Sequence, residues 1–422
     1  MEKLLPKGWV ETSLLKISNV FTGKKDANHG TVDGRYPFFT CAFEPLKSPD
    51  FSYDSEVMLL PGNGANVGEV FYYKGKFQAY QRTYIVDNIE INHRYLFYHL
   101  KHNWKIRNAN QQYGSATNYI KIGNFNDYSV EFPPLPEQER IVAKLDKLFA
   151  QHEKIKKALD RIPQLLKAFR QQVLTQAVTG KLTEQWREGK DLEEWKNEKA
   201  QDCCLKVQSG GTPKGSKFTS SGIPFLKVYN IVNNKIDFDS EPQYVSEEIH
   251  TTQIKKSIAY PGDVIMNIVG PPLNKIAMLT NQYPEWNLNQ AITIFRVKDY
   301  LNNKFLYYFF CEGTSVRSLG HDLRGVVGQA NISLSQCRNF DIPIPSLQEQ
   351  REIVRRVESL FAKADTIEAR YLTLKAKIDS LPQSILHKAF KGELVPQLPT
   401  DGDAKDLLAE IMALKEEVKG RK

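Results

Sequence analysis

The chain is poor in cysteine and has no long apolar run, and both absences exclude whole classes of protein. Its five cysteines are an odd set without a C-x-x-C spacing, so they indicate neither a disulfide framework nor a zinc site. No stretch approaches the roughly 20 apolar residues of a membrane-spanning helix, and the start MEKLLPKGW lacks the apolar core of a signal peptide. We therefore expect a cytoplasmic protein with reduced thiols and no membrane segment.

Catalytic motifs are also missing. Gly270-Pro271-Pro272-Leu273 lacks the leading Asn or Asp and the aromatic residue with which adenine methyltransferases hold an amino group. The run 210–217 reads GGTPKGSK, which is not a phosphate-binding loop, and the run 62–68 precedes a strand-like segment rather than a helix. The eight histidines show no metal-binding spacing. We expect no catalytic residue, no metal site and no cofactor on this chain.

The overall composition is that of a folded protein of more than one domain. Hydrophobic residues make up 41% and charged residues 25% of the 422 residues. The net charge of +8 raises the potential toward a polyanion, although many proteins that bind no nucleic acid are comparably basic. Charge alone therefore favours a nucleic-acid partner only weakly.

An internal repeat organises the chain. The segment PLPEQERIVAKLDKLFA at 134–150 returns as SLQEQREIVRRVESLFA at 346–362, so Glu137 corresponds to Glu349, 212 residues later. The same offset pairs Gly180 with Gly392, and the two copies stay in register across some fifty residues. We infer a duplicated architecture.

Each copy carries a heptad-like apolar seam with the period of a coiled coil. The first seam contains Ile141, Leu145, Leu148, His152, Ile155, Leu159, Ile162, Leu166, Phe169 and Val173. The second contains Ile353, Val357, Leu360, Ala364, Ile367, Tyr371, Leu374, Ile378, Leu381 and Ile385. We expect one long helix over 137–179 and a second after a capping box at Ser346 and Glu349, with kinks at Pro163 and Pro382. His152 is interpreted as a polar residue that the seam tolerates.

The segments before the two helices share landmarks. The stretch from Trp9 to Gly23 corresponds in sequence to that from Trp195 to Gly210, and Tyr36-Pro37-Phe38 corresponds to Ile223-Pro224-Phe225. Further pairs are Leu60-Pro61-Gly62 with Tyr260-Pro261-Gly262, and Asn118 with Asn331. Short β-rich runs broken by Gly, Pro and Asn alternate with helical ones, which predicts α+β domains built on a twisted or barrel-like sheet.

These patterns predict five regions. They are a first domain at 1–133, a helical spacer at 134–192, a second domain at 193–345, a second spacer at 346–396, and a C-terminal linker and helix at 397–422. A paired seam would make the spacer helices antiparallel and bring the chain's end back toward its start. The expected fold is two tandem α/β domains separated by two coiled-coil-like helices in a pseudo-twofold, circular arrangement.

The helical copies, with GKLTEQWR at 180–187 and KAFKGELVPQ at 388–397, resemble the conserved regions of the specificity subunits of type I restriction-modification systems. The resemblance covers the whole chain. It implies a non-catalytic subunit that binds double-stranded DNA with its two target-recognition domains, one for each half of a bipartite target. It also implies two adenine methyltransferase subunits and the motor-nuclease restriction subunits as partners, which would carry S-adenosylmethionine, ATP and Mg²⁺.

Candidate base contacts follow from chemistry, since Arg and Lys suit guanine while Asn and Gln suit adenine. In the first domain they are Lys24, Lys25, Asn63, Asn66, Tyr80, Gln81, Arg82, Ser115 and Asn118. In the second domain they are Lys214, Lys217, Asn267, Lys275, Asn289, Gln290, Arg324 and Gln329. The same residue types are also ordinary turn formers and surface residues. A helical scaffold that joins proteins without touching DNA is the alternative function.

Overall fold

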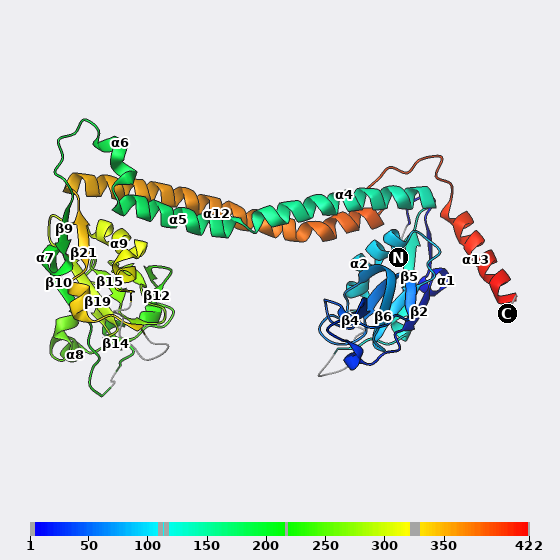
Figure 1. Ribbon diagram of the computed structural model, residues 1–422, viewed down its shortest axis with the longest axis horizontal. Coiled ribbons are helices and arrows are strands. Elements are labelled where there is room, and N and C mark those ends of the chain that lie inside the picture. Colours follow the sequence, from blue (N-terminus) through cyan, green and yellow to red (C-terminus); the bar gives the residue numbers. More distant parts are fainter. Residues whose placement is uncertain (1–4, 109–112, 114–117, 216–217, 321–329, 421–422) are drawn as a thin grey trace. The chain divides into compact units, whose positions relative to one another are not determined.

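A computed structural model describes residues 5–108, 113, 118–215, 218–320 and 330–420 of the chain. It forms two compact units, unit 1 with residues 1–160 and 372–422 and unit 2 with residues 161–371. Each unit combines one of the two predicted domains with parts of both helical spacers (Figure 1). The fold class is α+β, as the sequence predicts.

The first spacer forms two helices, where the apolar seam predicts one. They are α4 (Leu135–Leu159) and α5 (Ile162–Val178), and they separate just before Pro163, which lies in the first turn of α5. Proline has no N–H with which to bond the Leu159 carbonyl, so the backbone ladder is interrupted there. The second spacer is a single helix, α12 (Leu347–Phe390), which continues through Pro382.

In unit 1, α4 lies along the C-terminal part of α12 (Figure 1). The pairing is antiparallel, because Ile141 near the start of α4 shares a core with Leu386, whereas His152 further along bonds Ile378. In unit 2, α5 lies along the N-terminal part of α12. There Arg170 forms ion pairs with Asp365 and Glu368 at 2.6 and 2.8 Å. The helix pairing predicted by the two seams is therefore found within each unit.

His152 has a specific partner. The residue is 7% exposed, and its Nε2 lies 2.9 Å from the carbonyl oxygen of Ile378. Ile378 stands four residues before Pro382, whose ring nitrogen cannot donate the usual helical hydrogen bond to that carbonyl. His152 supplies the missing donor from the neighbouring helix.

The repeated apolar residues complete the cores of the two domains. Residues of α4 and of the C-terminal part of α12 are buried in the first core: Ile141, Val142, Leu145, Ile385, Leu386 and Ala389. Their counterparts at the 212 offset are buried in the second core: Ile353, Val354, Val357, Val173, Leu174 and Ala177. Each domain therefore packs on one helix from each spacer, which explains why both copies of the repeat keep the same apolar positions.

The first domain is built on a six-stranded sheet. Its strand order is β2 (Asn19–Thr22), β7 (Thr83–Asp87), β5 (Tyr53–Pro61), β6 (Phe71–Ala79), β3 (Tyr36–Phe39) and β4 (Leu46–Ser48). Neighbouring strands are antiparallel except β3 and β6, which are parallel. A separate pair, β1 (Val10–Ser13) and β8 (Ser129–Phe132), stands next to α4 in the sequence, and α2 (His93–Asn108) packs against α4.

The second domain keeps this plan with a divided sheet. Strands β10 (Cys204–Ser209), β19 (Ile292–Val297), β15 (Val264–Asn267) and β17 (Ile276–Met278) form one part. Strands β14 (Tyr244–Val245), β11 (Ile223–Leu226) and β18 (Asn287–Leu288) form the other. The pair β9 (Lys196–Lys199) and β21 (Asp341–Ile344) corresponds to β1 and β8. Helix α9 (Asn303–Glu312) packs on α5.

The junction between domain and helix is the same in both units. The Trp9 indole donates to Glu137 at 3.2 Å, and the Trp195 indole donates to Glu349 at 3.0 Å. The predicted capping box is half formed, because the Glu349 N–H donates to Ser346 Oγ at 3.3 Å while the Glu349 carboxylate accepts from Trp195 and Thr183 instead. The repeated glutamate anchors the incoming chain to the start of the helix.

The C-terminal segment belongs to unit 1. The Arg140 guanidinium holds both carboxylate oxygens of Asp401 at 2.8 and 2.6 Å, and the Ala404 N–H donates to the Gly8 carbonyl at 2.9 Å. Helix α13 (Ala404–Gly420) follows and buries Ile411 against the first domain. In the described part of the chain, no helix combines the length and apolar character needed to cross a bilayer.

Candidate nucleic-acid interface

Four loops of the first domain meet at one end of its sheet. Loop 23–26 follows β2, and loop 62–66 follows β5. Loop 80–82 precedes β7, and loop 118–120 precedes α3 (Gly123–Asn126). Backbone hydrogen bonds join them: Gly62 N–H to Arg82 O at 2.8 Å, Gly64 N–H to Asn118 O at 2.8 Å, and Gln81 N–H to Lys25 O at 2.9 Å. We call this set the first loop platform. It brings together most of the candidate residues of the first domain.

The side chains of the first platform differ in how free they are. Gln81 and Arg82 are exposed and line a cavity of about 280 Å³ with Gly62 and Ile120. Gln81 Nε2 donates to Asp26 at 3.0 Å, while Arg82 has no side-chain hydrogen bond or ion pair to any residue that the structure describes. Arg82 therefore offers an uncommitted guanidinium beside an amide side chain.

Other candidates of the first domain are partly committed. Asn66 Nδ2 donates to the Cys41 carbonyl at 2.9 Å, and the Lys25 ammonium pairs with Asp50 at 3.1 Å. A hydrogen bond from Gln78, with those from Lys25 and His29, holds the pKa of Asp50 well below its usual range. Asp50 thus stays charged and offsets the charge of Lys25.

Lys24 and Asn118 are exposed, and Asn63 and Tyr80 are half-buried. Asn63 forms an isolated bridge with Tyr119, and Tyr80 one with Lys25.

The second domain forms a corresponding loop platform at residues 210–214, 268–270, 289–291 and 331–332. Gly210 N–H donates to Ile292 O at 2.8 Å, Ile268 N–H to Ala291 O at 2.8 Å, and Ile332 N–H to Ile268 O at 2.9 Å. The first platform has the equivalent bonds, among them Gly23 N–H to Thr83 O at 3.1 Å and Ile120 N–H to Gly62 O at 2.9 Å. The backbone frame is therefore shared.

Glycine is required at the first loop of both platforms. A Cβ atom at Gly23 would lie 2.2 Å from the Ala79 carbonyl oxygen, and one at Gly210 would lie 2.1 Å from the Asn289 carbonyl oxygen. Both distances are far inside van der Waals contact, so only glycine permits this close backbone approach. The shared frame places Asn289-Gln290-Ala291 where the first domain has Tyr80-Gln81-Arg82.

Comparison with known proteins gives a consistent result. The family model described as the type I restriction modification DNA specificity domain matches residues 6–164 and 192–376. The type I restriction enzyme EcoDI specificity subunit of Escherichia coli is 34% identical over 412 residues, covering 93% of this chain and 90% of that protein. The chain belongs to this family.

Solved structures show the same fold as this specificity subunit. The HsdS subunit of Thermoanaerobacter tengcongensis aligns with a TM-score of 0.62 and 18% identity, covering 93% of this chain and 99% of that one. A chain from a study of complex assembly and conformational transition in the type I R-M system aligns with a TM-score of 0.67 and 17% identity, covering 93% and 100%. At these identities the likeness concerns the fold.

One candidate contact of the specificity subunit is wrong. Asn267 has no exposed surface, and its amide donates to Val269 O at 3.1 Å and Pro272 O at 2.8 Å. Its Oδ1 accepts from the Lys275 N–H at 2.6 Å. Asn267 therefore holds the loop after β15 in place and has no group left for a base.

The other second-domain candidates lie on or near the platform. Gln290 and Lys214 are exposed, and Asn289 is half-buried with its Oδ1 unpartnered. Lys275 is half-buried and donates to Val228 O at 3.3 Å, which makes it a weaker candidate. Four predicted contacts lie outside the described residues: Ser115, Lys217, Arg324 and Gln329.

Two of the predicted landmark pairs are also wrong. Asn63 bridges Tyr119 just as Val269 pairs with Asn331, so Tyr119 rather than Asn118 corresponds to Asn331. Gly62 follows β5 and corresponds to Ile268, whereas the run 260–262 precedes β15. The other two landmark pairs are confirmed. Strands β3 and β11 have the same register against β4 and β14, and β2 and β10 have the same register against β7 and β19.

Sequence reasoning missed two features beside the platforms. Tyr113 and Tyr119 lie with ring centroids 5.5 Å apart, and the Lys121 ammonium lies 4.4 Å from the Tyr113 centroid. A cluster of cationic side chains also flanks the second platform, at Lys206, Lys256 and Arg338. The aromatic spacing was visible in the sequence, but the three cations are so far apart along the chain that only the fold brings them together.

Proposed function

We propose that this chain is the sequence-recognition subunit of a type I restriction-modification complex, and that its two platforms read the two halves of an asymmetric DNA target. One observation supports this most strongly. The platforms share a backbone frame but present different side chains, Tyr80-Gln81-Arg82 in the first and Asn289-Gln290-Ala291 in the second. A common frame with unlike donors and acceptors suits two different base sequences.

A domain exchange tests this proposal. Replacing residues 196–343 by the corresponding segment of a related subunit should change one half of the methylated target and leave the other half unchanged. The readout is mapping of methylated sites after assembly with the partner subunits. A palindromic or continuous target, or a change in both halves, would contradict two independent readers.

The partners we propose are two methyltransferase subunits and the restriction subunits. The spacer helices of this chain would be their docking surface. Apolar side chains remain exposed on these helices. In unit 1 they are Ile155, Leu372, Leu374 and Leu381, and in unit 2 they are Leu165, Phe169 and Ile367. Five of these side chains are seam positions that the helix pairing leaves 37–49% exposed: Ile155, Phe169, Ile367, Leu374 and Leu381. Apolar surface that stays exposed in this way favours a further protein surface. Because this chain offers no catalytic motif, we propose that the partners carry out methyl transfer and cleavage. S-adenosylmethionine, ATP and Mg²⁺ would then bind to the partners. The complex would act in the cytoplasm, where the DNA lies.

Two measurements separate this proposal from a helical scaffold. The assembled complex should bind target DNA with an affinity that falls steeply as salt rises, because phosphate contacts release counterions. A flat salt response would favour the scaffold. The isolated chain should show no methyl transfer, nuclease or ATPase activity, and activity that disappears on mutating this chain would refute a non-catalytic role.

A further inference from the structure

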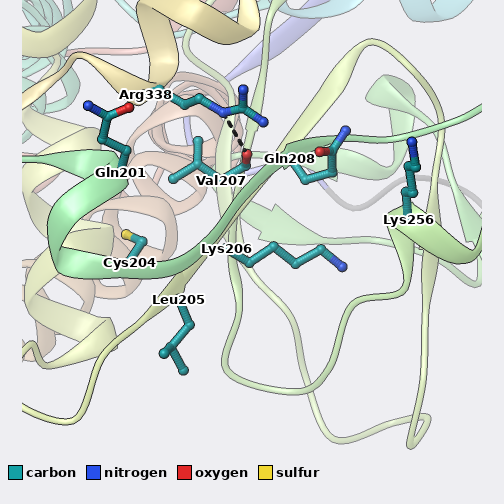
Figure 2. A pocket seen from close by; sticks show the side chains of 8 residues that line it. All are labelled: Gln201, Cys204, Leu205, Lys206, Val207, Gln208, Lys256 and Arg338. Carbon is teal, nitrogen blue, oxygen red and sulfur yellow. Dashed lines mark hydrogen bonds between the residues drawn. The ribbon is translucent and has the colours of Figure 1, made fainter.

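A basic hollow of about 510 Å³ lies on the flank of the second domain (Figure 2). It is formed by the edge strand β10, the short 3₁₀ helix Lys255–Ser257 and helix α11 (Leu334–Arg338). Its cations are Lys206 on β10, Lys256 on the turn and Arg338 on α11. The amide of Gln208 also lines it. We call it the flank pocket.

Two cations of the flank pocket, Lys206 and Arg338, are held by backbone carbonyls and are not neutralised by an ion pair. The Lys206 ammonium donates to the Ile258 carbonyl at 2.8 Å. Arg338 Nε donates to the Val207 carbonyl at 3.3 Å, the bond drawn as a dashed line in Figure 2. That bond leaves the two terminal nitrogens of Arg338 available, and Lys256 is exposed without a partner in the described part of the chain. None of the residues that line the pocket is acidic. Burial lowers the pKa of Lys206, so an anion beside it would strengthen its charged form.

The pocket continues directly from the second platform. Strand β10 runs into Gly210, which contacts the Asn289 carbonyl on the platform. Lys206 lies four residues before Gly210, or about 13 Å along an extended strand. That distance equals about four base pairs of duplex at roughly 3.4 Å each. A duplex that meets Asn289 and Gln290 with its bases and runs along β10 would place backbone phosphates within reach of the flank pocket.

The first domain lacks two of these charges. The register of β2 against β7 matches that of β10 against β19, so Asn19 corresponds to Lys206 and Phe21 to Gln208. Asn126 in α3 corresponds to Arg338 at the 212 offset. The same strand pairing forms in the first domain without Lys206 and Arg338, so this pairing does not require them.

We propose that the flank pocket binds the sugar-phosphate backbone of DNA beside the second half-site, with Lys206, Lys256 and Arg338 as phosphate contacts. This inference rests on the proposed function. It predicts that the two half-sites differ in sequence and also in how much phosphate contacts contribute to the binding affinity. Contacts of this kind add affinity and fix register without reading bases.

The test compares Lys256→Gln/Arg338→Gln with the unaltered chain, each assembled with the methyltransferase and bound to duplex target DNA. The slope of log affinity against log salt should become shallower by about 0.9 for each phosphate that the variant no longer neutralises. The base preference at both half-sites should stay the same. A neutral methylphosphonate beside the second half-site should weaken the unaltered complex, and the variant should no longer respond to it.

Two control variants make the outcome decisive. Lys235→Gln removes an exposed lysine of the same unit outside the pocket and should leave the slope unchanged. Lys256→Arg keeps the charge and should keep the slope. An unchanged slope in the double variant would overturn the pocket assignment, as would a loss of methyltransferase assembly, which would indicate an acidic protein segment as the ligand. If the unaltered complex bound DNA without salt dependence or sequence preference, the proposed function itself would fail.

Discussion

Among the individual residues, Arg82 is the side chain best placed to read a base. It is exposed just before β7, its backbone carbonyl is fixed by the Gly62 N–H, and its guanidinium has no partner in the described structure. A guanidinium held on a rigid strand end can present two parallel donors to guanine O6 and N7. The neighbouring Gln81 is less free because Asp26 accepts its amide.

We predict that Arg82→Ala weakens target binding by about 1–3 kcal/mol and relaxes specificity at one base pair of a single half-site. The measurement is competition binding of the assembled complex against targets with each base pair changed in turn. Arg35→Ala is the matched control, because Arg35 is exposed at the opposite end of β3 from the platform. A uniform loss across all sequences would instead make Arg82 a phosphate contact.

Residue types allowed candidate contacts to be predicted, but side-chain direction did not follow from the sequence. Asn267 lies in VIMN, a strand buried at every position, and its neighbours give no alternation that would show which face it occupies. Gln290 and Arg82 stand just before strands, where side chains are exposed. The cations of the flank pocket come from three distant segments, so no local pattern could group them.

At the level of elements, the contact between His152 and the Pro382 turn joins two helices through a backbone defect. The proline leaves the Ile378 carbonyl without its intrahelical donor, and the His152 imidazole satisfies it at 2.9 Å. The counterpart of His152 in the repeat is Ala364, and the counterpart of Pro382 is Arg170, so both members of the pair are absent from unit 2. We therefore infer that the histidine and the proline depend on each other.

A double-mutant cycle tests this dependence. His152→Leu keeps an apolar side chain of similar size but leaves a buried carbonyl unsatisfied, which should cost about 1–3 kcal/mol of unfolding free energy. The substitution Pro382→Ala restores the helical N–H, so His152→Leu should cost little or nothing in that background. Urea denaturation of the four full-length chains gives the coupling. Equal costs in both backgrounds would show that His152 only fills space.

The C-terminal segment is held on unit 1 by Asp401. The hydrogen bonds from Arg140, with that from the Leu398 N–H, lower the pKa of Asp401 below its ordinary 3.8. Its contribution is therefore complete at neutral pH and is lost as the pH falls through the lowered folded-state pKa.

We predict that Asp401→Asn loosens residues 393–417 at neutral pH, seen as faster amide hydrogen exchange there, with a cost of about 1–3 kcal/mol. The unaltered segment should loosen in the same way only in acid, below about pH 4. Asp406→Asn serves as the control, because Asp406 is exposed on α13. Protection that is unaffected in Asp401→Asn would mean that the apolar face of α13 alone holds the segment.

The elements themselves were largely predictable from the sequence, but some boundaries were not. The 3.5-residue seam predicted the helices, and the repeated Glu-Gln pair marks their starts because Glu137 and Glu349 bind tryptophan while Gln138 and Gln350 bond to Pro133 O and Pro345 O. Pro163 ends one helix and Pro382 does not, although both lie in the same periodic pattern. At Pro382 the His152 imidazole of the neighbouring helix bonds the freed Ile378 carbonyl, a contact that periodicity cannot show.

In the whole molecule, the division into two units explains the length of the repeat. Each unit needs a helix from both spacers to close its core, so both copies must keep the same apolar positions from the domain junction to the end of the helix. Leu159 and Tyr371, partners at the 212 offset, stand at the two places where the chain passes between units. Length could be changed there with the least damage to either core.

This geometry leads to a test of the helices as a ruler for the DNA target. Inserting one heptad after Leu159 and one after Tyr371 keeps the apolar period, whereas four residues would create a stutter. Seven residues at about 1.5 Å each would add about 10 Å, which corresponds to roughly three base pairs. We expect an assembled variant to recognise the same two half-sites with a longer spacer, or to lose tight binding because the added rise also demands rotation. A single insertion after Leu159 is the control and should destabilise the helix pairing, because the seams no longer match. An assembled, active double variant that kept the original spacer would contradict the ruler, since helices that set no distance would then serve only to join the two readers.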